Sequence, residues 1–401
     1  MVSYFYRGPV FDGTEFEDER SLIIDGESGS IERYGKSDEI DKPQNSTHLS
    51  TSGGILLPGL IDSHIHLYGS DSLDTLQIAS VPETASALRA VRDLRRLLDA
   101  GYTAVRDMGS KAGTYLRKAV EDGVIEGPDI FTCGRAIAQT GGDDDPVPLP
   151  LDVARILSTS YHVDGPWECR RAVRLLARDG ANLIKVYASG NLPQRGKVVR
   201  QFTLEELRAI VDEAHSTGLR VAAHAVGKES LSNAMDAGVD TIEHGLGLTE
   251  EICAKMAAKG TILVPTLTIY TFQWWKTPNP WREELVKNHL TTEIEMANRH
   301  GVKIAAGTDF SGASVIPHGQ NYKEVVNLSK ILGIPQALSA ATKVGAECLG
   351  IEQTGQLREG ARASIIIVKG DLERDLEALE PKNVILTMKD GIIHKSRLTW
   401  K

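Results

Sequence analysis

The chain has 401 residues, a formal net charge of −9 and a pI near 5.7, with 41% hydrophobic and 25% charged residues. An acidic chain with no basic run and no aromatic-basic stripe argues against nucleic acid or an anionic membrane surface as a partner. Its length exceeds the ordinary single-domain size, and a β/α barrel takes about 250 residues, so we expect one large domain and one smaller one.

The amino-terminal part predicts short β-strands. Residues 21–26 and 30–35 have the composition of two hairpin strands. Residues 1–8 lack a basic region followed by an apolar core, and no stretch has the length needed to span a bilayer, so we expect a cytoplasmic protein. The four cysteines are scattered without a C-x-x-C motif, and we expect them to be reduced.

His64 and His66 end an apolar run that begins near Gly53. Alternate side chains of a strand share one face, so the two imidazoles can reach one metal ion, whereas a helix would separate them. Such a pair alone is more often an accident of a turn. The interpretation as a metal site therefore depends on further ligands in a matching context.

Four further candidates follow in chain order, each at or near the carboxyl end of an apolar run. They are Lys185, His224, His244 and Asp309. Any one of these histidines alone is better explained as a hydrogen-bonded core residue, and Asp309 alone as a helix cap. The whole set favours a metal centre at the carboxyl ends of neighbouring strands.

Strand-like runs alternate with amphipathic helices between about residues 59 and 350, which predicts repeated β/α units in a barrel. One helix is well marked by a capping box, Thr203 to Glu206, and by a stop at Gly218. Short strands return at residues 364–368 and 384–393, the latter with an Asp-Gly turn. We expect an α/β fold, a (β/α)₈ TIM-like barrel over residues 58–351, with residues 1–57 and 352–401 forming one small β-sandwich.

The chain closely resembles the amidohydrolase superfamily, in its binuclear metal-dependent branch near the Xaa-Pro dipeptidases and imidazolonepropionase-like proteins. The motifs that carry the resemblance are Pro-Gly-Leu-Ile-Asp-Ser-His-Ile-His (58–66), Thr-Ala-Val-Arg-Asp (103–107), Ile-Lys-Val-Tyr-Ala-Ser-Gly (184–190), Val-Ala-Ala-His-Ala (221–225), Ile-Glu-His-Gly (242–245), Ala-Gly-Thr-Asp (306–309) and His318-Gly319 with Asn321 and Glu324. The resemblance implies a distorted barrel, a flanking β-sandwich and two divalent metals.

The same resemblance implies a role for each ligand candidate. His64, His66 and Asp309 would hold the more buried metal, and His224 and His244 the more exposed one. The metals are expected to be zinc, bridged by a hydroxide and by N6-carboxylysine at Lys185.

The chemistry needs these residue types for reasons of its own. Neutral imidazoles suit zinc, whereas a lysine ammonium would repel it. Lys185 becomes a ligand only if burial lowers its pKa enough for the amine to capture carbon dioxide; the alternative is a structural lysine beside a mononuclear site. Asp309 is the expected general base and acid. His318 is a second catalytic candidate, and a solvated loop histidine is an equally weighted interpretation.

Loops at the carboxyl face of the barrel carry substrate choice. Residues 139–145 are acidic where relatives often have Gly-Gly-His, and Val226 stands where many relatives have tyrosine. In the basic stretch 191–200 an arginine is expected to clamp a substrate carboxylate, and a tryptophan of residues 270–275 to cover an apolar side chain. The candidate substrate-binding residues are Tyr187, Arg195, Arg200, Trp274, Trp275 and His318.

These features predict a metal-dependent hydrolase that cleaves the carboxamide bond of a dipeptide, an N-acyl amino acid or a related small amide. The first alternative is a cyclic amide such as a lactam, and the second is a non-catalytic binding protein on the same fold. The expected partner is a small amide or peptide, and the oligomeric state is left open.

Overall fold

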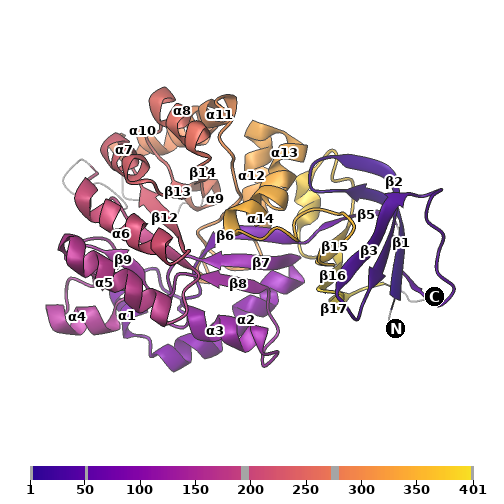
Figure 1. Cartoon of the computed structure of the whole chain (residues 1–401), viewed down its shortest axis with the longest axis horizontal. Coiled ribbons are helices and arrows are strands. Elements are labelled where there is room, and N and C mark those ends of the chain that lie inside the picture. The colour runs from indigo at the N-terminus through magenta and orange to yellow at the C-terminus, as the bar shows by residue number, and fades with distance from the viewer. Residues whose placement is uncertain (1–2, 50–52, 191–197, 272–279, 399–401) are drawn as a thin grey trace.

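The computed structural model describes residues 3–49, 53–190, 198–271 and 280–398. It has two parts that lie side by side, a barrel of strands and helices and a smaller sheet built from both ends of the chain (Figure 1). This agrees with the predicted fold class, and the domain limits drawn from the sequence stay a prediction.

The barrel strands pair in parallel, as β/α units require. A three-stranded sheet has the order β6-β7-β8, and a six-stranded sheet has the order β10-β9-β11-β12-β13-β14. The strands are β6 (Leu60–Ile65), β7 (Tyr102–Asp107), β8 (Asp129–Thr132), β9 (Ala136–Ala138), β10 (Ser160–His162), β11 (Leu183–Tyr187), β12 (Arg220–Ala225), β13 (Thr241–His244) and β14 (Ile262–Val264). Because β8 and β9 follow one another directly in the chain, they connect the two sheets on one side.

The segment before Asp309 connects the sheets on the other side, but it is not the regular strand predicted from the sequence. Its ladder pairing is limited to isolated bridges, Leu263 with Ile304 and Ile65 with Phe310, although further backbone hydrogen bonds join it to β14 and β6. Its glycine at position 307 lies so close to β14 and β6 that an added Cβ would stand 2.5 Å from a valine side chain. This crowding and the left-handed backbone at Asp309 interrupt the ladder while still joining β14 to β6.

Helices cover the outside of the barrel (Figure 1). They are α1 (Thr75–Ser80), α2 (Glu83–Asp99), α3 (Gly113–Glu121), α4 (Leu151–Leu157), α5 (Gly165–Arg178), α6 (Leu204–Ser216), α7 (Lys228–Ala237), α8 (Glu250–Lys259), α9 (Leu267–Thr271), α10 (Pro280–Asn288), the π-helix η2 (His289–Glu293), α11 (Ile294–Arg299), α12 (Tyr322–Leu332), α13 (Ile334–Ala340) and α14 (Lys343–Leu349). The predicted capping box is present: Thr203 accepts a bond from the Glu206 amide, and Glu206 accepts one from the Thr203 amide. The apolar faces of these helices and strands form one large buried core.

The two chain ends share a single eight-stranded sheet, which forms the small β-domain. The order is β17-β16-β15-β5-β1-β2-β3, with β4 beside β1. Its strands are β1 (Ser3–Phe11), β2 (Phe16–Asp25), β3 (Ser30–Lys36), β4 (Thr47–Leu49), β5 (Gly54–Pro58), β15 (Ile365–Lys369), β16 (Val384–Lys389) and β17 (Ile392–Ser396), and η3 (Leu376–Leu379) lies between β15 and β16. Both predicted hairpins are present, and Asp390 and Gly391 turn the second one.

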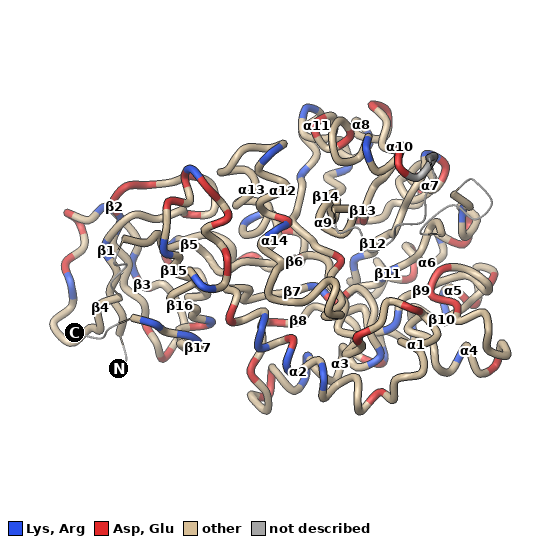
Figure 2. Tube along the Cα trace, turned by 180° about the vertical axis from the view of Figure 1, so that it is seen from behind, with Lys and Arg blue, Asp and Glu red and all other residues tan. Residues whose placement is uncertain are grey.

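Lys and Arg are interspersed with Asp and Glu over both parts of the described chain (Figure 2). Among the described helices, none is both long and apolar enough to cross a membrane. The four cysteines are buried and free, as expected.

Candidate metal centre

The six ligand candidates come together at the carboxyl edge of the barrel. They are His64 in β6, His66 just after it, Lys185 in β11, His224 in β12, His244 at the end of β13 and Asp309 after the irregular eighth segment. The imidazoles and the lysine are buried, whereas the Asp309 side chain keeps 21% of its exposure. Asp309 therefore lies on the side of the cluster that is open to solvent.

The distances are those of one compact cluster. Oδ1 of Asp309 lies 3.4 Å from Nε2 of His64 and 3.2 Å from Nε2 of His66. The ring centroids of His64 and His244 are 5.1 Å apart, and those of His224 and His244 are 4.5 Å apart. Ligand atoms of His64, His244 and Asp309 all lie within 4.8 Å of one another.

Partners on the far side of three rings fix their orientation. His64 donates from Nδ1 to Glu243 at 2.7 Å, and His66 donates from Nδ1 to the carbonyl of Gly109 at 3.0 Å. Nδ1 of His244 lies 2.7 Å from Oγ1 of Thr266. These bonds leave Nε2 of each ring directed to the cluster, which is how metal-binding histidines are normally held.

Burial sets the charge of the cluster. It lowers the pKa of His224 to about 3, and it lowers the pKa of His64 and of His244 well below the usual histidine value. Burial also acts to lower the pKa of His66, but the hydrogen bond to Asp309, the charge of Asp309 and the bond to Gly109 together outweigh burial and raise it. Three imidazoles are therefore neutral at neutral pH and have free lone pairs.

Lys185 is 1% exposed, and burial lowers the pKa of its amine. Its Nζ lies 5.2 Å from the centre of the Tyr187 ring, and its strand pairs with β12, which carries His224. The change in pKa is in the direction that a carbamate-forming lysine needs.

The cluster fits a divalent metal by an observation independent of any relative. Nε2 of His64 and Nε2 of His224 are buried without a hydrogen-bond partner among the described residues. A buried unpaired nitrogen costs about 1–3 kcal/mol, and a cation would satisfy its lone pair. Neutral imidazoles together with a carboxylate are a donor set that zinc accepts.

The sequence patterns did not predict the buried charged pair that lies behind His64. Glu243 receives the Nδ1–H of His64 and, at 2.8 Å, a bond from Nη2 of Arg106. Arg106 also donates to the carbonyl of Ser63. The available signal was a glutamate and an arginine inside short apolar strands, where a charge needs a partner.

A second support holds the backbone that carries His64 and Asp309. Asp62 accepts bonds from the amide and hydroxyl of Thr308, at 3.1 and 2.8 Å, and from the amide nitrogen of Asn321 at 2.7 Å. These bonds tie the first barrel strand to the eighth segment.

His318 lies behind the cluster. It is buried, and its Nε2 donates to the backbone carbonyl of His66 at 3.0 Å, so it supports the strand end that bears that ligand candidate. Burial lowers its pKa to about 4, so the ring is neutral. Its catalytic and substrate-binding roles stay predictions.

The substrate-binding candidates have different outcomes. Arg195, Trp274 and Trp275 lie outside the described residues. Arg200 is paired with Glu229 at 3.3 Å on the barrel rim. Tyr187 stands beside His224, with ring centroids 5.3 Å apart, and its hydroxyl donates at 2.9 Å to an aspartate of the acidic loop.

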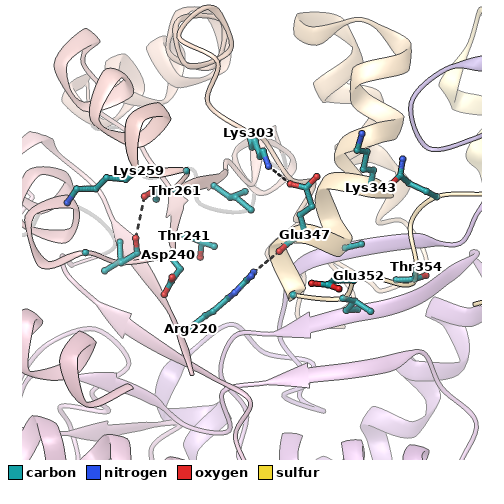
Figure 3. A pocket seen from close by; sticks show the side chains of 18 residues that line it. Arg220, Asp240, Thr241, Lys259, Thr261, Lys303, Lys343, Glu347, Glu352 and Thr354 are labelled. Atoms are coloured by element: carbon teal, nitrogen blue, oxygen red, sulfur yellow. Dashed lines mark hydrogen bonds and ion pairs between the residues drawn. The ribbon is translucent and has the colours of Figure 1, made fainter. Parts of the chain in front are cut away.

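A large cavity of about 710 Å³ lies at the other end of the barrel. Its lining includes Arg220, Thr241 and Ile262, which stand at the start of β12, β13 and β14. Figure 3 shows Lys303 directed at the Glu347 carboxylate and Arg220 bonded to the Glu347 carbonyl. These lining groups bond to one another. The cavity lies on the face opposite the histidine cluster, so it is separate from the candidate centre.

Comparison with known proteins gives a consistent result. The model of the amidohydrolase family matches residues 55–393. Ochratoxinase of Aspergillus niger is 33% identical over 398 residues, covering 89% of this chain and 80% of its own, and its crystal structure superposes with a TM-score of 0.90 at 30% identity, covering 99% and 96%. A crystal structure of a Xaa-Pro dipeptidase with bound methionine in the active site gives 0.85 at 30% identity, covering 98% and 100%. Imidazolonepropionase of Cutibacterium acnes is 26% identical over 331 residues, covering 79% and 76%.

Proposed function

Because this chain belongs to the amidohydrolase family and is a hydrolase of that superfamily, we propose that it cleaves the carboxamide bond of a dipeptide, an N-acyl amino acid or a related small amide. The observation that carries the proposal is the convergence of four imidazoles and Asp309 around a buried lysine. Similarity to a Xaa-Pro dipeptidase supports the dipeptide class.

We propose that His64, His66 and Asp309 hold one divalent metal, His224 and His244 a second, and that a carbamate on Lys185 bridges both. Zinc is the metal that this donor set favours. When bound, such a pair lowers the pKa of water and polarises a carbonyl oxygen. Glu243 and Arg106 keep the imidazole of His64 in the tautomer that presents Nε2.

Asp309 is proposed to move the proton. Burial would raise the pKa of Asp309, but its interactions with the neighbouring histidines, among them the hydrogen bond from His66, together outweigh that effect and lower the pKa, so the side chain is a carboxylate at neutral pH. As the most exposed member of the cluster, Asp309 is placed to accept a proton from water and to deliver it to the departing nitrogen. An amine leaving group requires that delivery.

A cyclic amide is the second candidate substrate, supported by the similarity to imidazolonepropionase. A lactam places the same carboxamide bond in a ring, so the roles of Asp309 and the histidines are unchanged. A non-catalytic binding protein is disfavoured because all six ligand positions are filled by residues that can bind metal.

The test joins metal analysis to a substrate screen. The purified protein is analysed by mass spectrometry for bound metal and assayed with dipeptides, including Xaa-Pro, N-acyl amino acids and lactams. We expect about two metals per chain and turnover in one of these classes. His224→Ala should lose metal and most activity, whereas His300→Ala, which removes a partner of Glu250 on the surface, should retain both.

Turnover of no amide in the screen would overturn the proposed activity. Retention of both metals and of the full rate in His224→Ala would overturn the proposed ligand set.

A further inference from the structure

The acidic loop after β9 contains three consecutive aspartates in different surroundings. Asp144 accepts bonds at Oδ2 from hydroxyls of Thr159, Ser160 and Tyr187, at 3.1, 3.0 and 2.9 Å. Asp145 accepts a bond from the amide of Gly141 at 2.8 Å. These two carboxylates fix the loop against β10 and β11.

Asp143 differs from its neighbours. Its Oδ2 is buried and has no hydrogen-bond partner among the described residues. Burial, with a further contribution from the charge of Asp144, raises its pKa to about 8, and the charges of Lys185 and Asp309 also act on it. The loop that carries this carboxyl group lies beside the candidate metal centre, because Asp144 accepts a bond from the hydroxyl of Tyr187, whose ring centroid is 5.3 Å from that of His224.

The position of this carboxyl group is fixed by packing. The neighbouring Gly142 has no room for a side chain, because an added Cβ would stand 2.5 Å from Oε1 of Gln201. Gln201 is itself buried beside β11, and its backbone amide donates to the carbonyl of Ala188 at 2.9 Å. The backbone next to Asp143 is thus packed against Gln201, while Oδ2 of Asp143 has no hydrogen-bond partner among the described residues.

We propose that Asp143 determines substrate specificity by receiving the protonated amine of a substrate, so that peptides with a free α-ammonium beside the scissile amide are preferred over N-acylated ones. This inference rests on the proposed function and names the substrate class within it. A buried acceptor without a partner is costly, and a cationic donor supplies the missing hydrogen bond.

The acidic setting favours a cation over a neutral donor. Asp144 places a further acidic side chain next to Asp143 in the chain. With a pKa of about 8 the Asp143 carboxyl group is largely protonated at neutral pH, and an ammonium bound beside it would favour its ionised form. Asp144 would attract the same ammonium and repel a substrate carboxylate.

The experiment compares three substrates that differ only at one nitrogen: the best dipeptide, its N-acetyl derivative and its desamino analogue. Wild type, Asp143→Asn and Asp143→Ala are assayed for KM and kcat, and metal content is measured in each. Asp152→Asn, at an exposed aspartate of α4, is the matched control. A charge-assisted hydrogen bond predicts that wild type and control prefer the free amine by about 10- to 100-fold.

In Asp143→Asn we expect this preference to disappear, mainly through a higher KM for the dipeptide, with metal content unchanged. Equal turnover of the three substrates by wild type, or an unchanged preference in Asp143→Asn, would overturn the inference and leave amide hydrolysis intact. Loss of metal in Asp143→Asn would also overturn it, because Asp143 would then be a ligand. Failure of wild type on every amide would overturn the proposed function itself, and the inference with it.

Discussion

Three residues at the carboxyl edge of the barrel adopt a left-handed backbone although each carries a side chain. The φ angles are 66° at His244, 51° at Thr266 and 60° at Asp309. Such conformations cost on the order of 1–3 kcal/mol each and persist only where surrounding bonds enforce them. Here His244 contacts Thr266, and the amide of Asp309 donates to the carbonyl of His64 at 2.7 Å.

Lys185 is the single residue that determines whether the proposed centre holds two metals or one. In Lys185→Ala we expect metal content to fall from about two per chain to one or fewer and most turnover to disappear, because the proposed bridge is lost. Added acetate should partly restore activity, since it offers the same paired oxygens. One tightly bound metal at full activity in wild type, kept together with the rate in Lys185→Ala, would contradict the binuclear mechanism.

Glu243 is the residue whose loss should damage both stability and metal binding. Glu243→Gln leaves the buried guanidinium of Arg106 without its counter-charge, which costs about 3–5 kcal/mol. It also weakens the bond that orients His64, which typically lowers metal affinity 10- to 100-fold.

The measurements are urea unfolding and metal titration with a competing chelator. Glu347→Gln, which alters an exposed pair with Lys303, is the control and should cost less than about 1 kcal/mol. Equal effects of the two substitutions would show that the buried pair has no special role.

At the scale of elements, strand ends determine where the functional groups lie and helix caps determine where the next segment begins. The capping box at Thr203 satisfies two amides at the start of α6 and ends the loop that follows β11. A cap of this kind stabilises a helix by about 1 kcal/mol.

We therefore expect Thr203→Ala to lower the free energy of unfolding by about 1 kcal/mol while leaving kcat/KM unchanged, because the cap lies outside the cluster. Urea unfolding and the amidase assay measure the two effects. Arg208→Ala, at an exposed position of the same helix, should change the free energy of unfolding by no more than about 0.5 kcal/mol and leave kcat/KM unchanged. If Arg208→Ala lowered the free energy of unfolding as much as Thr203→Ala, the effect would not be specific to the cap.

At the scale of the whole molecule, the sheet of the small domain cannot form from one end of the chain. β5 pairs with β15 along its whole length, although more than 300 residues of barrel lie between them. The side chains of residues 365–368 are fully buried. Each contributes on the order of 2 kcal/mol, so their combined loss is comparable with a typical total stability of about 5–15 kcal/mol.

Ending the chain after residue 363 should therefore give insoluble protein, because β5 would keep an open apolar edge. The soluble fraction after expression measures this. Ile392→Ser, at an exposed position of β17, is the control and should remain soluble. A soluble truncated chain with native metal content would show that the barrel folds independently of the terminal sheet.

The sequence alone determined the features that depend on local order. Strand alternation and strand ends predicted the barrel and grouped His64, His66, His224 and His244, because parallel strands bring their carboxyl ends to one edge. The capping box and the Asp-Gly turn were predicted for the same reason: their bonds join residues a few positions apart.

Features that depend on contacts between distant parts of the chain could not be predicted from local patterns. His64 and Glu243 are 179 positions apart, and Arg106 and Glu243 are 137 apart, so no local pattern pairs them. The irregular eighth segment arises from crowding by two other strands. The lack of a hydrogen-bond partner at Oδ2 of Asp143, among the described residues, arises from the packing of its loop. The burial and the hydrogen-bond partners of the site residues depend on residues that are distant in the sequence and come into contact only when the chain folds.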